Sequence, residues 1–261
     1  MDTVRPLLRI EDVSLSFGGI MALRDVSLDI LPNKLQAIIG PNGAGKTSLL
    51  NCINGFYRPQ KGRIHFKERD ITRTSPHEIA RLGIARTFQN VALFGGMTVL
   101  DNLMLGRIAT RRLPVTGILR SGVFWGLASH DEVKDREEVE RIIELLEIEA
   151  YRKSLVSSLP FGIQKLVELG RALAMNPSVL ILDEPTSGMS LEEKVDIVRY
   201  IMEVKERWGV TIILIEHDMK VVMDISDWIA VLDFGAKIAE GRPEEVQMNP
   251  AVIEAYLGKK T

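Results

Sequence analysis

The chain has 261 residues, of which 46% are hydrophobic, and its formal net charge is −2. This size and hydrophobic content allow one large folded domain, and the charge gives no basic field that would favour binding to nucleic acid. The single cysteine, Cys52, excludes an internal disulfide and fits a reducing compartment. The chain contains no apolar secretory segment and no run of 18 apolar residues, so we expect a soluble, cytosolic protein that could still attach to a membrane protein.

The first third of the chain predicts mostly strands. Residues 7–17 alternate between apolar and polar with a slip of one residue, and residues 26–30 alternate without a slip. Residues 35–40, LQAIIG, form a continuous apolar run, which is typical of a strand buried on both faces. A helix is expected from 45 to Gly55, a strand at 62–67, and a helix from the capping box SPHE (75–78) to Gly83.

Residues 97–175 predict mostly helices, and strands alternate with helices after residue 178. The strands are expected at 179–185, 211–217 and 228–235, with helices at 190–208 and 219–227 between them. Such alternation predicts parallel βαβ units. We therefore expect one domain over 1–261: an α/β core and β lobe from about 1–90 and 176–240, a helical lobe from about 91–175, and a helical tail at 241–261.

The stretch GPNGAGKT (40–47) stands between a predicted buried strand and a predicted helix, which is the context of a phosphate-binding loop. Its glycines let backbone N–H groups turn toward phosphate oxygens, and the start of the helix adds its dipole. Lys46 would reach the β- and γ-phosphates, and Thr47 would place its hydroxyl on Mg²⁺. The alternative is a glycine-rich turn without a ligand. The predicted nucleotide contacts in this stretch are Gly40, Pro41, Asn42, Gly43, Ala44, Gly45, Lys46, Thr47 and Ser48.

Polar residues follow three predicted strands. Asp183 and Glu184 end the strand VLILDEP, Gln89 follows IARTF, and His217 closes TIILIE. Ligands of open α/β sheets gather at the carboxyl ends of the strands, so Asp183 can meet the phosphate loop and hold the Mg²⁺ shell. Glu184 can then polarise the attacking water. Taken singly, each of these residues could equally be an ordinary surface or core polar group.

The order of GPNGAGKT, Gln89, the stretch LPFGIQK (159–165), ILDEP and His217 resembles the ATP-binding cassette (ABC) family over nearly the whole chain. The resemblance implies a P-loop NTPase with a RecA-like core, an antiparallel β lobe and a helical lobe, which binds ATP with Mg²⁺ and hydrolyses it to ADP and phosphate. It implies that Gln89 senses the γ-phosphate, joins Thr47 and Asp183 at the metal and touches a transmembrane partner, and that His217 contacts the γ-phosphate. Phe17 matches the aromatic residue that stacks on adenine; the alternative is core packing at a strand end. The implied catalytic set is Lys46, Gln89, Glu184 and His217.

In this family two cassettes face each other head to tail, and the helix beginning near 160 covers the ATP of the other cassette. We refer to residues 159–164 as the signature segment: Leu159, Pro160, Phe161, Gly162, Ile163 and Gln164. The family pattern is Leu-Ser-Gly-Gly-Gln, and here Pro160 replaces the serine, Phe161 the first glycine and Ile163 the glutamine. Gly162 remains, and Pro160 is expected in the first turn of its helix.

The lost serine hydroxyl is worth roughly 1.5–3 kcal/mol in a bond to a charged phosphate. Ser190 also replaces an aspartate that usually follows the Glu184 strand. Both losses affect the partner's ATP, whereas the groups that serve this chain's own ATP are intact. We therefore predict an asymmetric heterodimer with a second cassette; the alternative is a homodimer that tolerates the divergence.

The region around 107–135, the tail at 241–258 and the relaxed signature segment resemble the LivG-type ATP-binding subunit of branched-chain amino-acid importers. This resemblance implies a peripheral subunit on the cytoplasmic face of the membrane, bound to permease subunits and served indirectly by a periplasmic or extracellular substrate-binding protein. Two alternatives are an ABC ATPase of a soluble assembly or of another cargo, and a regulatory cassette with weak hydrolysis. A P-loop kinase is disfavoured because no segment resembles an acceptor site.

Overall fold

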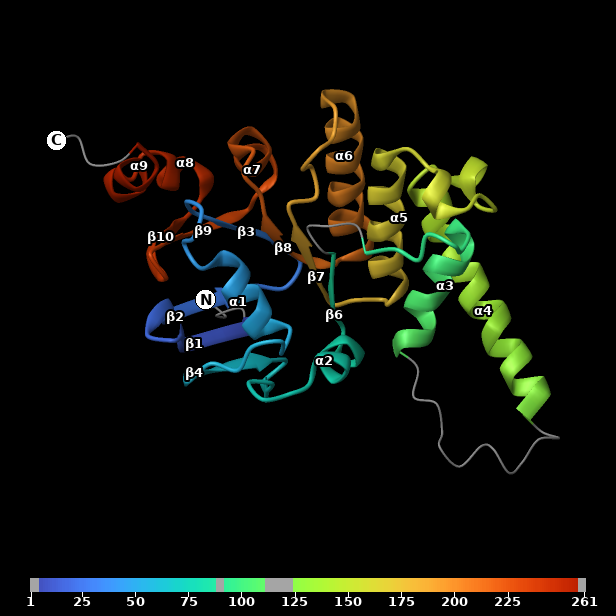
Figure 1. Cartoon of the computed structure of the whole chain (residues 1–261), viewed down its shortest axis with the longest axis horizontal. Coiled ribbons are helices and arrows are strands. Elements are labelled where there is room, and N and C mark those ends of the chain that lie inside the picture. The colour runs from blue at the N-terminus through green and yellow to red at the C-terminus, as the bar shows by residue number, and fades with distance from the viewer. Residues whose placement is uncertain (1–4, 88–91, 111–123, 258–261) are drawn as a thin grey trace.

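The computed structural model describes residues 5–87, 92–110 and 124–257. An antiparallel sheet in the order β2-β1-β4-β5 lies beside α1 (Figure 1). It consists of β1 (Leu8–Phe17), β2 (Ile20–Ile30), β4 (Lys61–Phe66) and β5 (Arg69–Asp70). The predicted slip in the first strand is a register shift between Ile10 and Val13, where β1 pairs with β2. A bulge of this kind lets the strand keep apolar residues on its buried face on both sides of the shift.

The core of the molecule is a second sheet in the order β10-β9-β3-β8-β7-β6. The strands β3, β6, β7, β8 and β9 run parallel, and β10 is antiparallel to β9. Their bounds are β3 (Leu35–Ile39), β6 (Ile84–Arg86), β7 (Val179–Asp183), β8 (Thr211–Ile215), β9 (Trp228–Asp233) and β10 (Ala236–Gly241).

The continuous apolar runs of the core strands follow from burial on both faces. In β3, Ala37 and Ile39 pack into one core with the helical lobe, while Ile38 packs into another with α1 and the antiparallel sheet. In β8, Ile212 and Ile213 divide between the same two cores. Because successive side chains point to opposite faces, most positions are apolar, with buried Gln36 in β3 and Thr211 in β8 as exceptions.

Helices cover both faces of the core sheet, and α3, α4 and α5 form a helical lobe at its side (Figure 1). Those in the first half of the chain are α1 (Lys46–Ile53), α2 (Pro76–Leu82), α3 (Val99–Thr110), α4 (Phe124–Leu145) and α5 (Phe161–Ala174). They are followed by α6 (Leu191–Trp208), α7 (Met219–Ile225), α8 (Pro243–Gln247) and α9 (Pro250–Leu257). The predicted fold class, an α/β core with an antiparallel sheet and a helical lobe, is confirmed.

Candidate nucleotide-binding site

The phosphate loop connects β3 to α1 and uses its glycines in different ways. Gly40, Gly43 and Gly45 have φ angles of 150°, 83° and 102°. A Cβ atom at Gly40 would lie 2.0 Å from the carbonyl oxygen of Leu232, and one at Gly45 would lie 2.5 Å from that of Ala22, so both positions exclude a side chain. A Cβ at Gly43 would have no neighbour within 4 Å. The middle of the loop is therefore open to a ligand, while its two ends are packed against the protein.

Lys46 is folded into this loop. Its side chain is buried, and Nζ donates hydrogen bonds to the carbonyl oxygens of Gly40 at 2.7 Å and Pro41 at 3.0 Å. Burial lowers the pKa of Lys46, while the charges of Glu184 and Asp183 act in the opposite direction. Thr47, the next residue, is exposed at the start of α1. A buried ammonium and an exposed hydroxyl thus adjoin the opening at Gly43, where phosphate oxygens can be bound.

Asp183 ends β7, next to the strand that ends in Arg86. Nη2 of Arg86 donates to Oδ2 of Asp183 at 2.7 Å, and each side chain is only 6% exposed. Nη1 of Arg86 donates to Oδ1 of Asn51 on α1 at 2.8 Å. The ion pair therefore links the carboxylate predicted to hold Mg²⁺ to the helix that follows the phosphate loop. The sequence analysis did not identify Arg86, although a charged residue that ends a buried strand is a signal of the same kind as Asp183.

Glu184 and His217 form a pair across two neighbouring strand ends. Nε2 of His217 lies 2.8 Å from Oε1 of Glu184, and the backbone N–H of Glu184 donates to the carbonyl oxygen of Ile215. Glu184 has a φ of 51°, a conformation that costs free energy for a residue other than glycine and often occurs at functional sites. The Glu184 side chain is 16% exposed and that of His217 46%. The two residues predicted to act on the attacking water and the γ-phosphate are therefore in direct contact.

Glu216, which the sequence analysis also missed, holds the turn that carries His217. Its buried carboxylate accepts hydrogen bonds from the backbone and hydroxyl of Thr186 and from the backbone N–H groups of His217 and Asp218. Asp218 in turn begins α7 and pairs with Lys194 at 2.9 Å. One carboxylate thus fixes the turn after β7 relative to the turn after β8.

Phe17 lies on the surface at the end of β1 and is not a core residue, since its side chain is 46% exposed. Its ring contacts that of Tyr57 edge to face, with centroids 5.0 Å apart and planes at 70°. This geometry removes the alternative of core packing and leaves one face of an aromatic pair at the surface.

The structure corrects the prediction for Pro160. The residue is the N-cap of α5 with ψ 150°, and the helix itself begins at Phe161, so Pro160 lies one residue before the first turn. An extended conformation at that residue leaves its carbonyl oxygen able to accept the first helical hydrogen bond, from the N–H of Gln164 at 3.0 Å. The Gln164 side chain donates back to the carbonyl oxygen of Leu159 at 2.9 Å.

Gly162 is buried against a side chain of the same protein. A Cβ atom placed there would lie 2.1 Å from Oε1 of Glu193, on the first turn of α6. Glu193 accepts a hydrogen bond from the backbone N–H of Ser190 at 2.8 Å, and the Ser190 hydroxyl accepts one from the N–H of Glu193 at 3.3 Å. A carboxylate of the α6 capping box therefore approaches Gly162 closely within the same chain.

Gln89 lies outside the described residues, so its place in the site stays a prediction. The last described residues before Gln89 are Arg86 and Thr87, at the edge of the site. The chain after it is fixed by buried Asn102 on α3, which exchanges hydrogen bonds with the backbone N–H and carbonyl of Phe94. A segment that joins the sheet to the helical lobe thus starts beside Asp183.

Comparison with known proteins assigns this arrangement to a family. Residues 23–187 match the family described as ABC transporter, and residues 236–260 match one described as branched-chain amino acid ATP-binding cassette transporter. The chain belongs to the ABC transporter family. It is 41% identical to the "High-affinity branched-chain amino acid transport ATP-binding protein LivG" of Salmonella typhimurium over 98% of this chain and 99% of the relative.

Further relatives and solved structures agree. The corresponding protein of Escherichia coli K12 is 37% identical and BraF of Pseudomonas aeruginosa is 39% identical, each over 98% of this chain and 99% of the relative. A nucleotide-free ATP-binding cassette from an ABC transporter superposes with a TM-score of 0.83 at 35% identity, over 97% of this chain and 99% of the other. A cassette in its ADP conformation gives 0.82 at 34% identity over the same shares. The chain is therefore an ABC-type ATPase that binds ATP.

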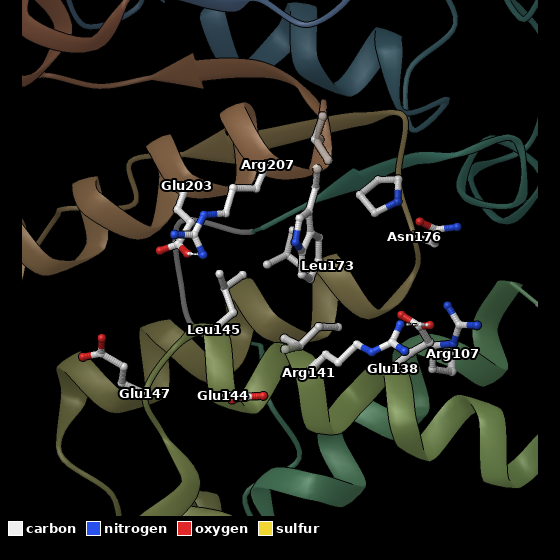
Figure 2. A pocket seen from close by; sticks show the side chains of 14 residues that line it. Arg107, Glu138, Arg141, Glu144, Leu145, Glu147, Leu173, Asn176, Glu203 and Arg207 are labelled. Carbon is white, nitrogen blue, oxygen red and sulfur yellow. Dashed lines mark hydrogen bonds and ion pairs between the residues drawn. The ribbon is translucent and has the colours of Figure 1, made fainter.

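Two further features describe this ABC ATPase outside its phosphate loop. Within the part of the chain that the structure covers, no helix is both long and apolar enough to cross a lipid bilayer. A cavity of about 610 Å³ is lined by residues of α3, α4 and α6 and of the connection after α5 (Figure 2). Its three arginines each pair with an acid, Arg107 with Asp135, Arg141 with Glu138 and Arg207 with Glu203. None of the predicted site residues lines it.

Proposed function

We propose that this ABC ATPase drives an importer of branched-chain amino acids. The observation that carries the proposal is full-length similarity to ATP-binding proteins named for that transport, together with the match of the tail, residues 236–260, to a family of the same description. In this proposal residues 1–261 act as one ATP-binding domain. It attaches to permease subunits at the cytoplasmic face of the membrane, and a binding protein on the other side delivers the cargo.

The residues around the phosphate loop fit ATP together with Mg²⁺. The open position at Gly43 and the exposed Thr47 hydroxyl adjoin buried Lys46, and the carboxylate of Asp183 acts electrostatically on the same ammonium. Hydroxyl and carboxylate oxygens are ligands that Mg²⁺ prefers. Bound Mg²⁺ would neutralise charge on the phosphates. Thr47 and Asp183 would hold it, joined by Gln89, while Lys46 stabilises negative charge that develops on the γ-phosphate.

Glu184 is proposed to accept the proton of the attacking water, and His217 to position the γ-phosphate. Their contact of 2.8 Å lets the imidazole orient the carboxylate. The positive φ of Glu184 turns the backbone at the end of the strand and so sets the direction of its side chain. Phe17 and Tyr57 offer an aromatic surface for adenine. Most of the rate then comes from positioning and electrostatic stabilisation, as in other phosphoryl transfers.

The variant Glu184→Gln tests the catalytic part of the proposal. It keeps the shape of the side chain but cannot accept the proton, so ATP binding should persist while steady-state hydrolysis falls by about 100-fold or more. Binding is measured with a fluorescent ATP analogue and hydrolysis by phosphate release. Hydrolysis at the wild-type rate by the variant would remove Glu184 from this role.

Uptake tests the cargo. A strain that lacks this chain should lose energy-dependent uptake of labelled leucine, isoleucine and valine, and should regain it with the wild-type chain but not with Glu184→Gln. Uptake of a sugar through another importer is the control. If branched-chain uptake is unchanged in the deletion strain, the cargo is of another class, although the ATPase assignment is unaffected.

We further propose that the working dimer is asymmetric. Pro160 is exposed in the signature segment but has no hydroxyl, and the Ser190 hydroxyl accepts a hydrogen bond within its own helix cap. The Ser190 hydroxyl also hydrogen-bonds to the Glu193 carboxylate, so its own proton is engaged within the chain. Neither residue therefore offers a free side-chain donor to a facing ATP in the way that a complete signature does. A second cassette with the missing serine would cover the ATP held by this chain.

ATPase activity of the purified chain across a wide concentration range tests this asymmetry. An asymmetric dimer predicts a low rate at every concentration and a rise when the cognate second cassette is added. A rate that increases with the square of the concentration to the level of a typical cassette would show that the signature segment is sufficient by itself and that a homodimer works.

A further inference from the structure

A second cavity, of about 540 Å³, opens at the end of the core sheet opposite to the phosphate loop. Gln36, near the start of β3, Trp228, the first residue of β9, and Arg242, which follows β10, contribute to its lining. The phosphate loop leaves the other end of β3, so none of the residues predicted to contact ATP lines this cavity. Its volume lies in the range of small-molecule sites.

The Gln36 amide lacks a partner in this cavity wall. Its side chain is 2% exposed, and Nε2 is buried without a hydrogen bond among the residues that the structure covers. A buried amide of this kind costs roughly 1–3 kcal/mol unless it is paired. As placed, the Nε2 donor is buried. A half-turn of the terminal torsion exchanges the amide oxygen and nitrogen, so the side chain can also present its donor from the position of the oxygen. The unmet hydrogen bond indicates that a partner is missing.

The lining carries three carboxylates and the two cations Lys34 and Arg242, and one of these cations is left available to a ligand. Each of the three carboxylates in the lining already has a partner: Asp29 pairs with Arg9 at 3.1 Å, Asp227 with Lys205 at 2.7 Å, and Glu240 accepts from Trp228 Nε1 at 2.9 Å. Arg242, in contrast, makes no ion pair among the described residues; its backbone N–H donates to the Glu245 carboxylate, and its carbonyl oxygen accepts from the N–H of Val246. A guanidinium in that state is suited to a carboxylate or phosphate oxygen.

Besides Lys34, whose Nζ lies 3.5 Å from a carboxylate oxygen of Asp227, the rest of the wall is apolar. The indole of Trp228 is 36% exposed, and its hydrogen bond to Glu240 fixes the orientation of the ring. Leu31, which follows β2, is 38% exposed and lines the same cavity. A rigid indole and an aliphatic side chain favour a hydrocarbon body over a highly charged phosphate ester.

We propose that this cavity is a ligand site for a small carboxylate with an apolar body. Arg242 and the Gln36 amide bind the carboxylate, and the hydrocarbon lies against Trp228 and Leu31. The site is separate from the phosphate loop, so binding there does not require ATP.

The test is a saturation-transfer NMR titration of the full-length chain with 4-methylpentanoate, with 4-methylpentanamide as its uncharged counterpart. A ligand of this size in a preformed pocket should bind with a Kd on the order of 1 mM. The variants are Arg242→Gln, which removes the charge at the surface, and Gln36→Leu, which removes the amide. The matched control is Arg207→Gln, because Arg207 lines the separate cavity drawn in Figure 2 and not the proposed ligand site. ATP binding by each variant checks that the fold is intact.

The proposal predicts that Arg242→Gln weakens binding of the carboxylate at least about tenfold, that Gln36→Leu also weakens it, and that Arg207→Gln leaves it unchanged. The amide should bind at least about tenfold more weakly than the acid. Equal binding of acid and amide, or retained binding in Arg242→Gln, would overturn the assignment. So would the absence of binding to the wild-type chain at concentrations of about 10 mM.

Discussion

Replacing Gly162 with alanine tests the contact between the signature segment and α6. The new Cβ would meet Oε1 of Glu193 at 2.1 Å and its Cδ at 2.7 Å, so the carboxylate must move. When it moves, it gives up the hydrogen bond from the backbone N–H of Ser190, which is 2.8 Å long. A helix cap of this kind is worth about 1 kcal/mol.

A second effect has the opposite sign. Alanine in place of glycine within a helix stabilises the folded state by roughly 0.5–1 kcal/mol, and Gly162 is the second residue of α5. In the wild-type background the two effects nearly cancel, so Gly162→Ala should leave stability unchanged or lower it slightly. In a Glu193→Ala background only the helical gain remains, and the same substitution should stabilise the protein by about 0.5–1 kcal/mol.

The wild type, Gly162→Ala, Glu193→Ala and the double variant form a double-mutant cycle. Equilibrium urea unfolding of these four proteins measures the coupling free energy between the two positions, expected at about 1 kcal/mol, or a difference of about 2–4 °C in Tm. The control background is Glu192→Ala, because Glu192 lies on the same turn of α6 and is not among the nearest neighbours of a Cβ at residue 162. There, Gly162→Ala should behave as in the wild type. If the substitution has the same effect with and without Glu193, the side chain does not rest on this glycine.

Three further predictions concern buried groups. Arg86→Met leaves the Asp183 carboxylate, 6% exposed, without its ion pair and should cost about 3–5 kcal/mol in urea unfolding, with Arg86→Lys retaining part of it. Cys52 is 1% exposed and burial raises its pKa to about 12, so Ellman's reagent should fail to react at about pH 8 until the protein unfolds; a fast reaction would contradict this packing. Burial would raise the pKa of Asp227, but hydrogen bonds from Lys205 and the N–H of Leu35 hold it below the ordinary value. The stabilisation that ionised Asp227 gives the folded state is therefore complete above the unfolded pKa of about 3.9 and is lost as the pH falls through the lower folded pKa. Asp227→Asn should cost about 1–2 kcal/mol of stability near neutrality and progressively less in acid. A cost that does not depend on pH would refute this reasoning.

The strands and the phosphate loop were predictable because their signals are local. The run at 35–39 is apolar except at Gln36, since its apolar residues divide between two cores, and glycines at 40, 43 and 45 stand where positive φ angles occur. The strand β10 was not predicted. Its residues, AKIAEG, are mostly half-buried, so neither alternation nor a continuous apolar run marks them.

The contacts made by the site residues were not predictable, because they join positions far apart in the sequence. Arg86 meets Asp183 only since β6 is the neighbour of β7 in the sheet, and Glu193 reaches Gly162 only since α6 starts beside the signature segment. Residue type indicated that Asp183 could bind a cation. It did not indicate that the nearest cation would be an arginine of the same chain.

Several of the polar groups expected to act on ATP are already engaged within the described part of the chain. Lys46 donates to two carbonyl oxygens of its own loop, Asp183 accepts from Arg86, and Glu184 contacts His217. Unpaired groups in so buried a site would be costly, so these internal partners stabilise the protein before nucleotide arrives. Binding ATP therefore exchanges one set of hydrogen bonds for another, and the affinity reflects the difference between the two sets. It follows that an Arg86 variant that still folds should lose more stability than affinity for ATP. The Asp183 carboxylate lacks its ion pair in the nucleotide-free variant and gains a metal partner only when ATP is bound.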